Sequence, residues 1–327
     1  MNKQIKIGIL GVGHLGKIHV KLLKEIPEFD LVGFYDINKE TSDYVNHTYG
    51  IKAFNSMESL VAQVDAIDIV TPTPSHFFCA QAAIKAGKHI FIEKPVTLTL
   101  EESENLIKLV NEAQVTAQVG HVERFNPAFL SIKDILNKPQ FIDTQRFAIF
   151  NTRGIDVSVV LDLMIHDLDI VLSTIKSPIK RISASGMSLI TDSVDIANAR
   201  LEFLNGSVAN LTVSRIAVAN IRKANFFQKG ALISVDFLNK TSEIFSIDEA
   251  GRSAAAKRVP LDMGTDKEAK EIIIEKPKVI LNNAIADELT AFSESILNNA
   301  PIIVPLEDGH NAVVVAHQII EKINNKL

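Results

Sequence analysis

Residues 5–16 of the chain have the sequence IKIGILGVGHLG, a short apolar run that ends in three spaced glycines. The apolar run predicts a buried strand, and apolar residues at helical spacing after it predict an amphipathic helix. In a strand–turn–helix unit of this kind, Gly11 permits the tight turn, Gly13 lets a ligand approach the backbone, and Gly16 lets the helix lie close to the strand. The helix N-terminus offers N–H groups to phosphate. The loop, with His14 and Leu15, therefore predicts a dinucleotide-binding site.

An acidic residue follows the loop at the spacing that such sites use. Asp36 ends the second predicted strand, 20 residues after Gly16. A carboxylate at that place accepts hydrogen bonds from both hydroxyls of the adenosine ribose and repels a 2′-phosphate. No arginine follows it immediately, and Lys39 is the only cation nearby. We therefore expect the cofactor to be NAD rather than NADP.

The first 120 residues alternate apolar runs with amphipathic stretches. Strands that alternate with helices predict a parallel sheet with helices on both faces, and runs that are apolar throughout fit strands buried on both sides. We expect a doubly wound Rossmann domain, class α/β, over residues 1–121. Its predicted strands are Ile5–Leu10, Leu31–Tyr35, Ala66–Val70, His89–Ile92 and Thr116–Val119.

The pattern changes after about residue 122, where strands follow one another closely. Asn205-Gly206 between two apolar runs is a strong hairpin signal, because both residues tolerate positive φ. We expect an α+β domain over residues 122–327, with a large, mostly antiparallel open sheet. The predicted strands are 140–150, 200–204, 207–213, 225–227, 231–236 and 242–247, the predicted helices are 157–175, 283–297 and 306–323, and a polar loop is predicted over 251–278.

Composition and charge exclude several other classes of protein. The formal net charge of −5 argues against a nucleic-acid binder, which normally carries a basic surplus. No apolar run is long enough to cross a membrane, and the N-terminus lacks the pattern of a signal peptide. Cys79 is the only cysteine, so an intramolecular disulfide is impossible. We expect a cytoplasmic protein with a small-molecule substrate.

Glu93-Lys94-Pro95 stands directly after the predicted strand His89–Ile92. Ligands of open α/β sheets bind beyond the carboxyl ends of the strands, so we expect Lys94 to face the cofactor cleft. A lysine that is desolvated there has a lowered pKa and can act as an acid or a base. The alternative is an ordinary surface lysine that follows a strand.

The predicted helix over 157–175 is apolar around most of its circumference. Asp162, His166, Asp169 and Ser173 interrupt it at i, i+4, i+7 and i+11, which places them in one narrow stripe. We expect this stripe to face a cleft, where His166 exchanges a proton and Asp162 tunes it or binds substrate. The alternative is a core histidine with a carboxylate partner. A metal site is not expected, because the other histidines are scattered without ligand spacing.

These motifs together resemble the glucose-fructose oxidoreductase / inositol dehydrogenase / MocA (GFO/IDH/MocA) family over nearly the whole chain. The resemblance extends to residues 71–76, TPTPSH. It implies hydride transfer between a nicotinamide cofactor and a carbon that bears a hydroxyl or carbonyl group, and a homodimer or homotetramer formed through the second domain's sheet. It implies that Lys94, Asp162 and His166 are catalytic. It also implies cofactor contacts from Thr71, Pro72, His76, Glu93 and Lys94.

A narrower resemblance comes from residues 120–128, GHVERFNPA, and 162–167, DLMIHD. Both segments look like those of nucleotide-sugar 3-dehydrogenases that act on UDP-N-acetylglucosamine or its uronic acid. Arg124 is suited to pair with a diphosphate or carboxylate, and Asn126 to hold sugar hydroxyls. We therefore expect His121, Arg124, Asn126 and Asp162 to bind substrate. The alternative for Arg124 is that it only fastens the junction between domains.

The expected reaction is the NAD-dependent oxidation of a secondary alcohol at C3 of a nucleotide sugar. Either His166 or Lys94 takes the hydroxyl proton, and the residues alone do not say which. A first alternative is a dehydrogenase of a free sugar, an inositol or another carbonyl compound. A second alternative is a non-enzymatic regulator that binds NAD on the same fold.

Overall fold

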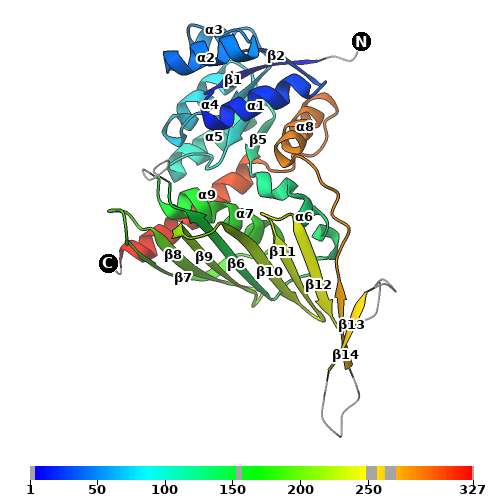
Figure 1. Ribbon diagram of the computed structural model, residues 1–327. Helices are drawn as coiled ribbons and strands as arrows, with labels where there is room; N and C mark the ends of the chain where they lie inside the picture. The colour runs from blue at the N-terminus through cyan, green and yellow to red at the C-terminus, as the bar shows by residue number, and fades with distance from the viewer. Residues whose placement is uncertain (1–3, 152–156, 248–255, 262–269, 326–327) are drawn as a thin grey trace. The chain divides into compact units, whose positions relative to one another are not determined.

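The computed structural model describes residues 4–151, 157–247, 256–261 and 270–325. The chain divides into two compact units, one of Met1–Val122 with Asn283–Val314 and the other of Glu123–Asn282 with Val315–Leu327 (Figure 1). The sequence-based division instead gives all residues after 121 to the second domain. No described helix is long and apolar enough to cross a bilayer.

The first unit is built on a five-stranded parallel sheet in the order β2-β1-β3-β4-β5 (Figure 1). This confirms the predicted doubly wound fold. The strand order reverses at β1, because β2 lies on one side of it and β3 on the other. The carboxyl end of β1 is therefore the switch point at which such sheets bind ligands. The strands are β1 (Ile5–Leu10), β2 (Phe29–Tyr35), β3 (Ala66–Ile69), β4 (His89–Glu93) and β5 (Ala117–Gly120).

Helices from both ends of the chain cover this sheet. Phe91 of β4 and Phe292 of α8 meet edge to face with ring centroids 5.9 Å apart, so a helix far along the sequence belongs to the first unit's core. The helices of the first unit are α1 (His14–Glu25), α2 (Lys39–Tyr49), α3 (Met57–Val61), η1 (Thr73–Ser75), α4 (His76–Lys85), α5 (Leu100–Ala113) and α8 (Ala284–Leu297). The last helix, α9 (Leu306–Asn324), gives its beginning to the first unit and its end to the second.

The second unit contains a nine-stranded sheet in the order β13-β14-β12-β11-β10-β6-β9-β8-β7. Only β6 and β9 are parallel neighbours. Gly206 has φ +86 in the predicted hairpin between β8 and β9. The strands are β6 (Phe141–Ile149), β7 (Ile179–Met187), β8 (Ile196–Phe203), β9 (Val208–Ala217), β10 (Ile221–Gln228), β11 (Ala231–Asp236), β12 (Thr241–Ser246), β13 (Lys257–Leu261) and β14 (Lys270–Glu275).

The polar loop predicted over 251–278 is wrong where the structure describes it, because β13 and β14 pair there. β13 lies at the edge of the sheet and β14 lies between it and β12. Lys257, Arg258, Lys270 and Glu271 are exposed, so these charges do not oppose pairing. The rest of that segment lies outside the described residues. The sequence pattern also missed β7, whose side chains are largely exposed at the opposite edge.

Helices cover one face of the nine-stranded sheet, and no helix of the described residues covers the other (Figure 1). Along β8, Ala197, Ala199 and Leu201 are buried, whereas Asn198 and Arg200 are exposed. The helix predicted over 157–175 is a π-helical turn, η4 (Val160–Met164), followed by α7 (Ile165–Thr174). The remaining short helices are η2 (Val122–Phe125), α6 (Pro127–Leu130) and η3 (Lys133–Ile135).

Candidate active site

The glycine loop lies between β1 and α1, and its three glycines have different reasons to be glycine. Gly11 has φ +86, and a Cβ there would lie 2.8 Å from the carbonyl oxygen of Val70. A Cβ on Gly16 would collide with the carbonyl oxygen of Gly11. Gly13 is exposed, and no atom lies within 4 Å of where its Cβ would be. Gly11 and Gly16 are thus required by the fold, whereas Gly13 leaves space for a ligand at the N-terminus of α1.

This difference predicts opposite outcomes for two alanine substitutions. Gly13→Ala leaves the thermal midpoint unchanged but weakens cofactor binding by about tenfold or more, because its methyl group fills the ligand's space and not the protein's. Gly16→Ala lowers the thermal midpoint, because its methyl group overlaps backbone. Calorimetry and cofactor titration of both variants check this, and a Gly13→Ala protein that binds cofactor like the wild type contradicts it.

Asp36 is held in place at the end of β2 by two backbone amides. The Val12 N–H donates to Oδ2 at 2.8 Å, and the Asn38 N–H donates to Oδ1 at 2.8 Å. The carboxylate is half-buried, and each oxygen keeps a lone pair for a further donor. These bonds fix the acid beside the glycine loop, as the binding of an adenosine ribose requires.

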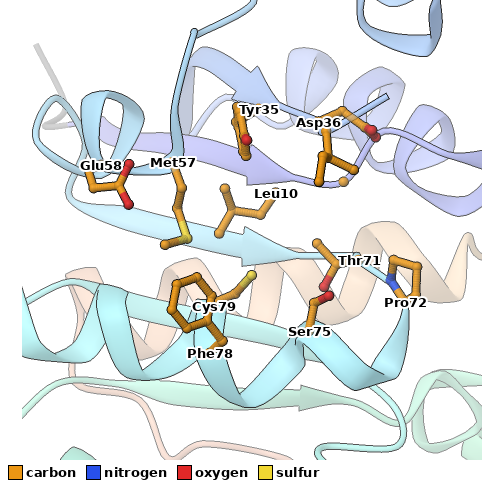
Figure 2. A pocket seen from close by; sticks show the side chains of 12 residues that line it. Leu10, Tyr35, Asp36, Met57, Glu58, Thr71, Pro72, Ser75, Phe78 and Cys79 are labelled. Carbon is orange, nitrogen blue, oxygen red and sulfur yellow. The ribbon is translucent and has the colours of Figure 1, made fainter. Parts of the chain in front are cut away.

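A cavity of about 290 Å³ opens beside Asp36. Figure 2 shows Asp36 and Tyr35 on one side of it and α4 on the other. Ile37 and Phe78 line it with side chains that are 92% and 64% exposed, and Thr71 and Pro72 line the end nearest the glycine loop. The walls are mostly apolar, and Asp36 and Glu58 are the two carboxylates that line them. Such a lining, with Asp36 fixed in place, suits a planar base and its ribose. The described residues therefore fit the adenosine half of a dinucleotide.

Lys94 lies half-buried at the carboxyl end of β4, in a turn of residues 93–96 that we call the Lys94 turn. His76 holds this turn from one side. Its Nδ1 lies 2.9 Å from the Pro95 oxygen and its Nε2 lies 2.8 Å from the Thr71 oxygen. Burial lowers the pKa of His76. The structure thus places His76 as a buried clamp between two loops at the ligand edge of the sheet.

A second buried histidine, His19, lies close to Glu93 at the start of the Lys94 turn and was missed from the sequence. Its Nδ1 is 2.9 Å from Asp68 Oδ2, and its Nε2 is 3.4 Å from Glu93 Oε1. His19 and Asp68 are fully buried. The sequence carries a signal for both residues, because Asp68 interrupts an apolar strand and His19 shares the apolar face of its helix with Leu15 and Leu22.

Asp162 and His166 lie on neighbouring turns in the second unit. Asp162 is in η4 and its N–H donates to the Ser158 oxygen, while His166 is in the first turn of α7. Both side chains are half-buried. π-Helical turns occur often at functional sites. The other members of the expected stripe are engaged inside the unit, because Asp169 binds Arg124 and the Ser173 hydroxyl donates to the Ile170 oxygen.

The other residues expected to bind substrate have structural partners. Arg124 donates from Nε and Nη2 to the two oxygens of Asp169, each at 2.7 Å. Asn126 donates to Glu123 and to the Phe237 oxygen at 3.0 Å, and its own oxygen caps α6. His121 is buried in the first unit. The structure thus shows Arg124 and Asn126 fastening parts of the second unit.

The structure groups the expected site residues by unit. The glycine loop, Asp36, Thr71, Pro72 and Lys94 follow carboxyl ends of strands in the first unit. Asp162 and His166 belong to the second unit. The approach of Lys94 to His166 stays a prediction.

Comparison with known proteins finds models of the same family for the N-terminal and the C-terminal part of the chain. Residues 5–121 match the model of an oxidoreductase family with an NAD-binding Rossmann fold, and residues 138–232 match the GFO/IDH/MocA C-terminal domain. UDP-N-acetylglucosamine 3-dehydrogenase of Acidithiobacillus ferrooxidans is 34% identical over 96% of both chains. Its solved structure superposes with a TM-score of 0.88 at 32% identity and covers 98% of each chain. Myo-inositol 2-dehydrogenase of Thermotoga maritima is 24% identical over 98% of this chain and 97% of its own.

The glycine loop, the fixed Asp36 carboxylate, the adenosine-sized cavity and the half-buried Lys94 lie in the matched N-terminal region. The second matched region includes η4 and α7, which carry Asp162 and His166. These features and the near full-length similarity agree with one another. The chain belongs to the GFO/IDH/MocA family of oxidoreductases, which bind NAD on a Rossmann fold.

Proposed function

We propose that this oxidoreductase uses NAD to oxidise the C3 hydroxyl of a nucleotide sugar of the UDP-N-acetylglucosamine type. The observation that carries the proposal is the similarity to UDP-N-acetylglucosamine 3-dehydrogenase, which is 34% identical over 96% of this chain. The myo-inositol 2-dehydrogenase of similar coverage is 24% identical. The GHVERFNPA segment at 120–128 supports the same substrate class, because it looks like the corresponding segment of nucleotide-sugar 3-dehydrogenases.

The catalytic group in this proposal consists of Lys94, Asp162 and His166. A bound nicotinamide supplies the hydride acceptor. Lys94 or His166 removes the hydroxyl proton, and a cationic Lys94 also stabilises negative charge that develops on the substrate oxygen. Asp162 orients these groups or binds the sugar. Arg124 and Asn126 serve substrate binding indirectly in this proposal, because their side chains bind Asp169, Glu123 and Phe237.

The choice of NAD over NADP rests on Asp36. Asp36→Asn removes the negative charge but keeps an oxygen for one of the two backbone amides that hold the side chain. We expect it to weaken NAD⁺ binding and strengthen NADP⁺ binding. The dissociation constant of NADP⁺ divided by that of NAD⁺ should therefore fall about 10- to 100-fold. Calorimetric titration with each dinucleotide measures that ratio.

The matched control for this variant is Asp30→Asn. Asp30 is exposed at the opposite end of the same strand, β2. We expect this variant to bind both dinucleotides as the wild type does. An Asp36→Asn protein that keeps the wild-type ratio contradicts the assignment of NAD.

The proposed substrate class is tested with a panel of alcohols and both cofactors. Absorbance at 340 nm follows NADH formation with UDP-N-acetylglucosamine, its uronic acid, free N-acetylglucosamine, myo-inositol and scyllo-inositol. A hydroxylamine trap for the ketone removes product, so that an unfavourable equilibrium does not hide activity. We expect turnover with a nucleotide sugar and none with the free polyols, and product analysis should place the ketone at C3. Turnover with free polyols alone overturns the substrate class but not the reaction class.

We further propose that two or four copies associate through the uncovered face of the nine-stranded sheet and that the enzyme acts in the cytoplasm. Arg181, Glu202 and Arg200 form a ladder of ion pairs on that sheet. The single cysteine, Cys79, is buried. Light scattering of the purified protein measures the assembly, and a monomeric mass at micromolar concentration contradicts this part of the proposal.

A further inference from the structure

We propose that His19 is a positioning residue for Lys94: held as an imidazolium between Asp68 and Glu93, it fixes the Glu93 carboxylate to which the Lys94 backbone is hydrogen-bonded. Nothing in the mechanism above uses these three buried ionisable side chains, which we call the His19 cluster. The inference rests on the proposed catalytic role of Lys94.

The His19 cluster joins three separate elements of the first unit. His19 lies in the second turn of α1, the helix that begins at the glycine loop. Asp68 lies within β3, and Glu93 is the last residue of β4. Each element leads to a different part of the expected site: the phosphate loop, the Thr71 loop and the Lys94 turn. The contact of His19 with Asp68 and Glu93 therefore fixes the positions of these three loops relative to one another at the ligand edge of the sheet.

The positions of the two carboxylates favour a protonated ring. Asp68 Oδ2 lies 2.9 Å from Nδ1 and Glu93 Oε1 lies 3.4 Å from Nε2. A neutral imidazole has one N–H and would turn a lone pair toward one carboxylate, whereas an imidazolium turns an N–H toward each. Burial alone would lower the pKa of His19, but Asp68 and Glu93 outweigh that effect and raise the pKa well above its ordinary value.

The two oxygens of Glu93 face different partners. Oε1 faces His19, and Oε2 accepts a hydrogen bond from the Lys94 N–H at 3.3 Å. The carboxylate also lies against Gly120 of β5, where a Cβ would be 2.7 Å from Oε1. With Gly120 on one side and His19 on another, the carboxylate has little room to move, and its second oxygen is held on the backbone of the catalytic lysine.

The surroundings of the cluster contain few other charges among the described residues. His76 contacts Pro95 in the Lys94 turn, and the charge of Glu93 partly opposes the lowering of the His76 pKa by burial. The helix α8 presents Phe292 and the buried Glu288 on its sheet-facing side, and the Glu288 carbonyl accepts from Gln118 of β5. The ring of Phe91 lies 6.0 Å from that of His19. In this mostly apolar setting the charges of His19 and Glu93 are screened weakly. We therefore expect the loss of the His19 charge to move the Glu93 carboxylate and the Lys94 turn.

The charge state is tested first, on the full-length protein without cofactor. Nitrogen-15 spectra of the histidine rings, with the His19 signal identified by its loss in His19→Gln, report both ring nitrogens. We expect a doubly protonated His19 between about pH 6 and pH 8 in the wild type, and deprotonation within that range in Glu93→Gln. A neutral His19 ring at pH 7 in the wild type overturns the proposal.

The positioning role is tested with two uncharged replacements that differ in geometry. The amide nitrogen of Gln takes the place of Nε2 and keeps a donor toward Glu93, whereas that of Asn takes the place of Nδ1 and keeps a donor toward Asp68. We expect His19→Gln to keep kcat within about threefold and His19→Asn to lower it about 10- to 100-fold, with little change in the KM for the sugar. His47→Gln, exposed on α2, is the matched control and should leave kcat unchanged.

Equal losses of kcat in His19→Gln and His19→Asn overturn the proposal, because a merely structural histidine does not distinguish the two carboxylates. If His19→Asn fails to fold, the Glu93→Gln titration decides. Failure of the proposed function is recognised separately: full turnover in Lys94→Ala removes the catalytic role of Lys94, whatever the charge of His19. A dead Lys94→Ala protein with a neutral His19 ring removes only the present inference.

Discussion

Lys94→Ala lowers the rate of hydride transfer by about 10²- to 10⁴-fold and leaves cofactor binding largely intact. His166→Ala has an effect of the same order. The reason is that both variants keep the glycine loop and Asp36, which we propose hold the adenosine half of the cofactor, and lose a group that we propose acts on the hydroxyl proton. Stopped-flow absorbance at 340 nm measures hydride transfer, and calorimetric titration measures the dissociation constant of NAD⁺.

A second pair of variants separates the two roles open to Lys94. Lys94→Arg keeps a positive charge but cannot act as a base, because arginine stays protonated. If Lys94 mainly stabilises the alkoxide, Lys94→Arg keeps part of the activity that Lys94→Ala loses. If Lys94 is the base, both variants are equally inactive. His166→Gln is compared with His166→Ala in the same way, because glutamine keeps a hydrogen-bonding group but cannot act as the base.

The control is Lys85→Ala, at the exposed C-terminal end of α4. This end of the helix precedes β4 and so lies at the amino edge of the sheet, away from Lys94. We expect wild-type rates from this variant. Full activity in both Lys94→Ala and His166→Ala ends the catalytic assignment.

Arg146→Met destabilises the second unit by about 3–5 kcal/mol, which is the largest effect on stability that we expect. Arg146 donates to Asp167 and to Glu123 at 2.9 Å, and all three side chains are buried. Burial alone would lower the pKa of Arg146, but Asp167 and Glu123 raise it above its ordinary value. Methionine fills much of the same volume and leaves two buried carboxylates without their cation.

The measurement must separate the two units. Tyr35, Tyr44 and Tyr49 are the only tyrosines, the chain has no tryptophan, and all three lie in the first unit. Tyrosine fluorescence in urea therefore follows the first unit, while amide hydrogen exchange of residues 141–149 and 165–174 follows the second. We expect faster exchange in those two segments and an unchanged fluorescence transition. Lys229→Met, exposed in the turn between β10 and β11, should leave exchange unchanged.

The stability that the second unit loses in Arg146→Met, which we call the deficit, depends on pH in a defined direction. Burial raises the pKa of Asp167, and Arg146 opposes that rise. Without Arg146 the folded variant holds a proton at pH values where the unfolded chain has released it, so its stability falls as pH rises above the ordinary carboxylate pKa. The deficit is therefore larger at pH 8 than at pH 5. A deficit that shrinks as pH rises contradicts the buried ion-pair account.

The strands of the first unit could be predicted because they are local. Each is a mostly apolar run, since helices cover both faces of the sheet, and predicted and observed boundaries agree within two residues. β13 and β14 could not be predicted in the same way. β13 is an edge strand with mostly exposed side chains, and the apolar part of β14 is only three isoleucines long, so pairing with neighbouring strands and not apolar periodicity makes them strands.

Part of the candidate site also follows from local sequence. The glycine loop and Asp36 are predicted from their spacing, and the structure shows the loop and the backbone bonds that this spacing requires. Arg124 shows where such reasoning ends. The Arg124 guanidinium group can pair with an anionic substrate or with an aspartate equally well. Only the fold brings Asp169 within 2.7 Å of it.

The sequence by itself determined the order of strands and helices in the first unit up to β5, the glycine turn and the acid beside it, because each depends on neighbours within a few residues or on a regular repeat. Tertiary structure alone decided which charges meet. His19 finds Asp68 and Glu93, and Arg146 finds Asp167 and Glu123, across separate elements. The physical reason is that a buried charge selects its partner by distance in space, and burial arises only once the elements have packed together.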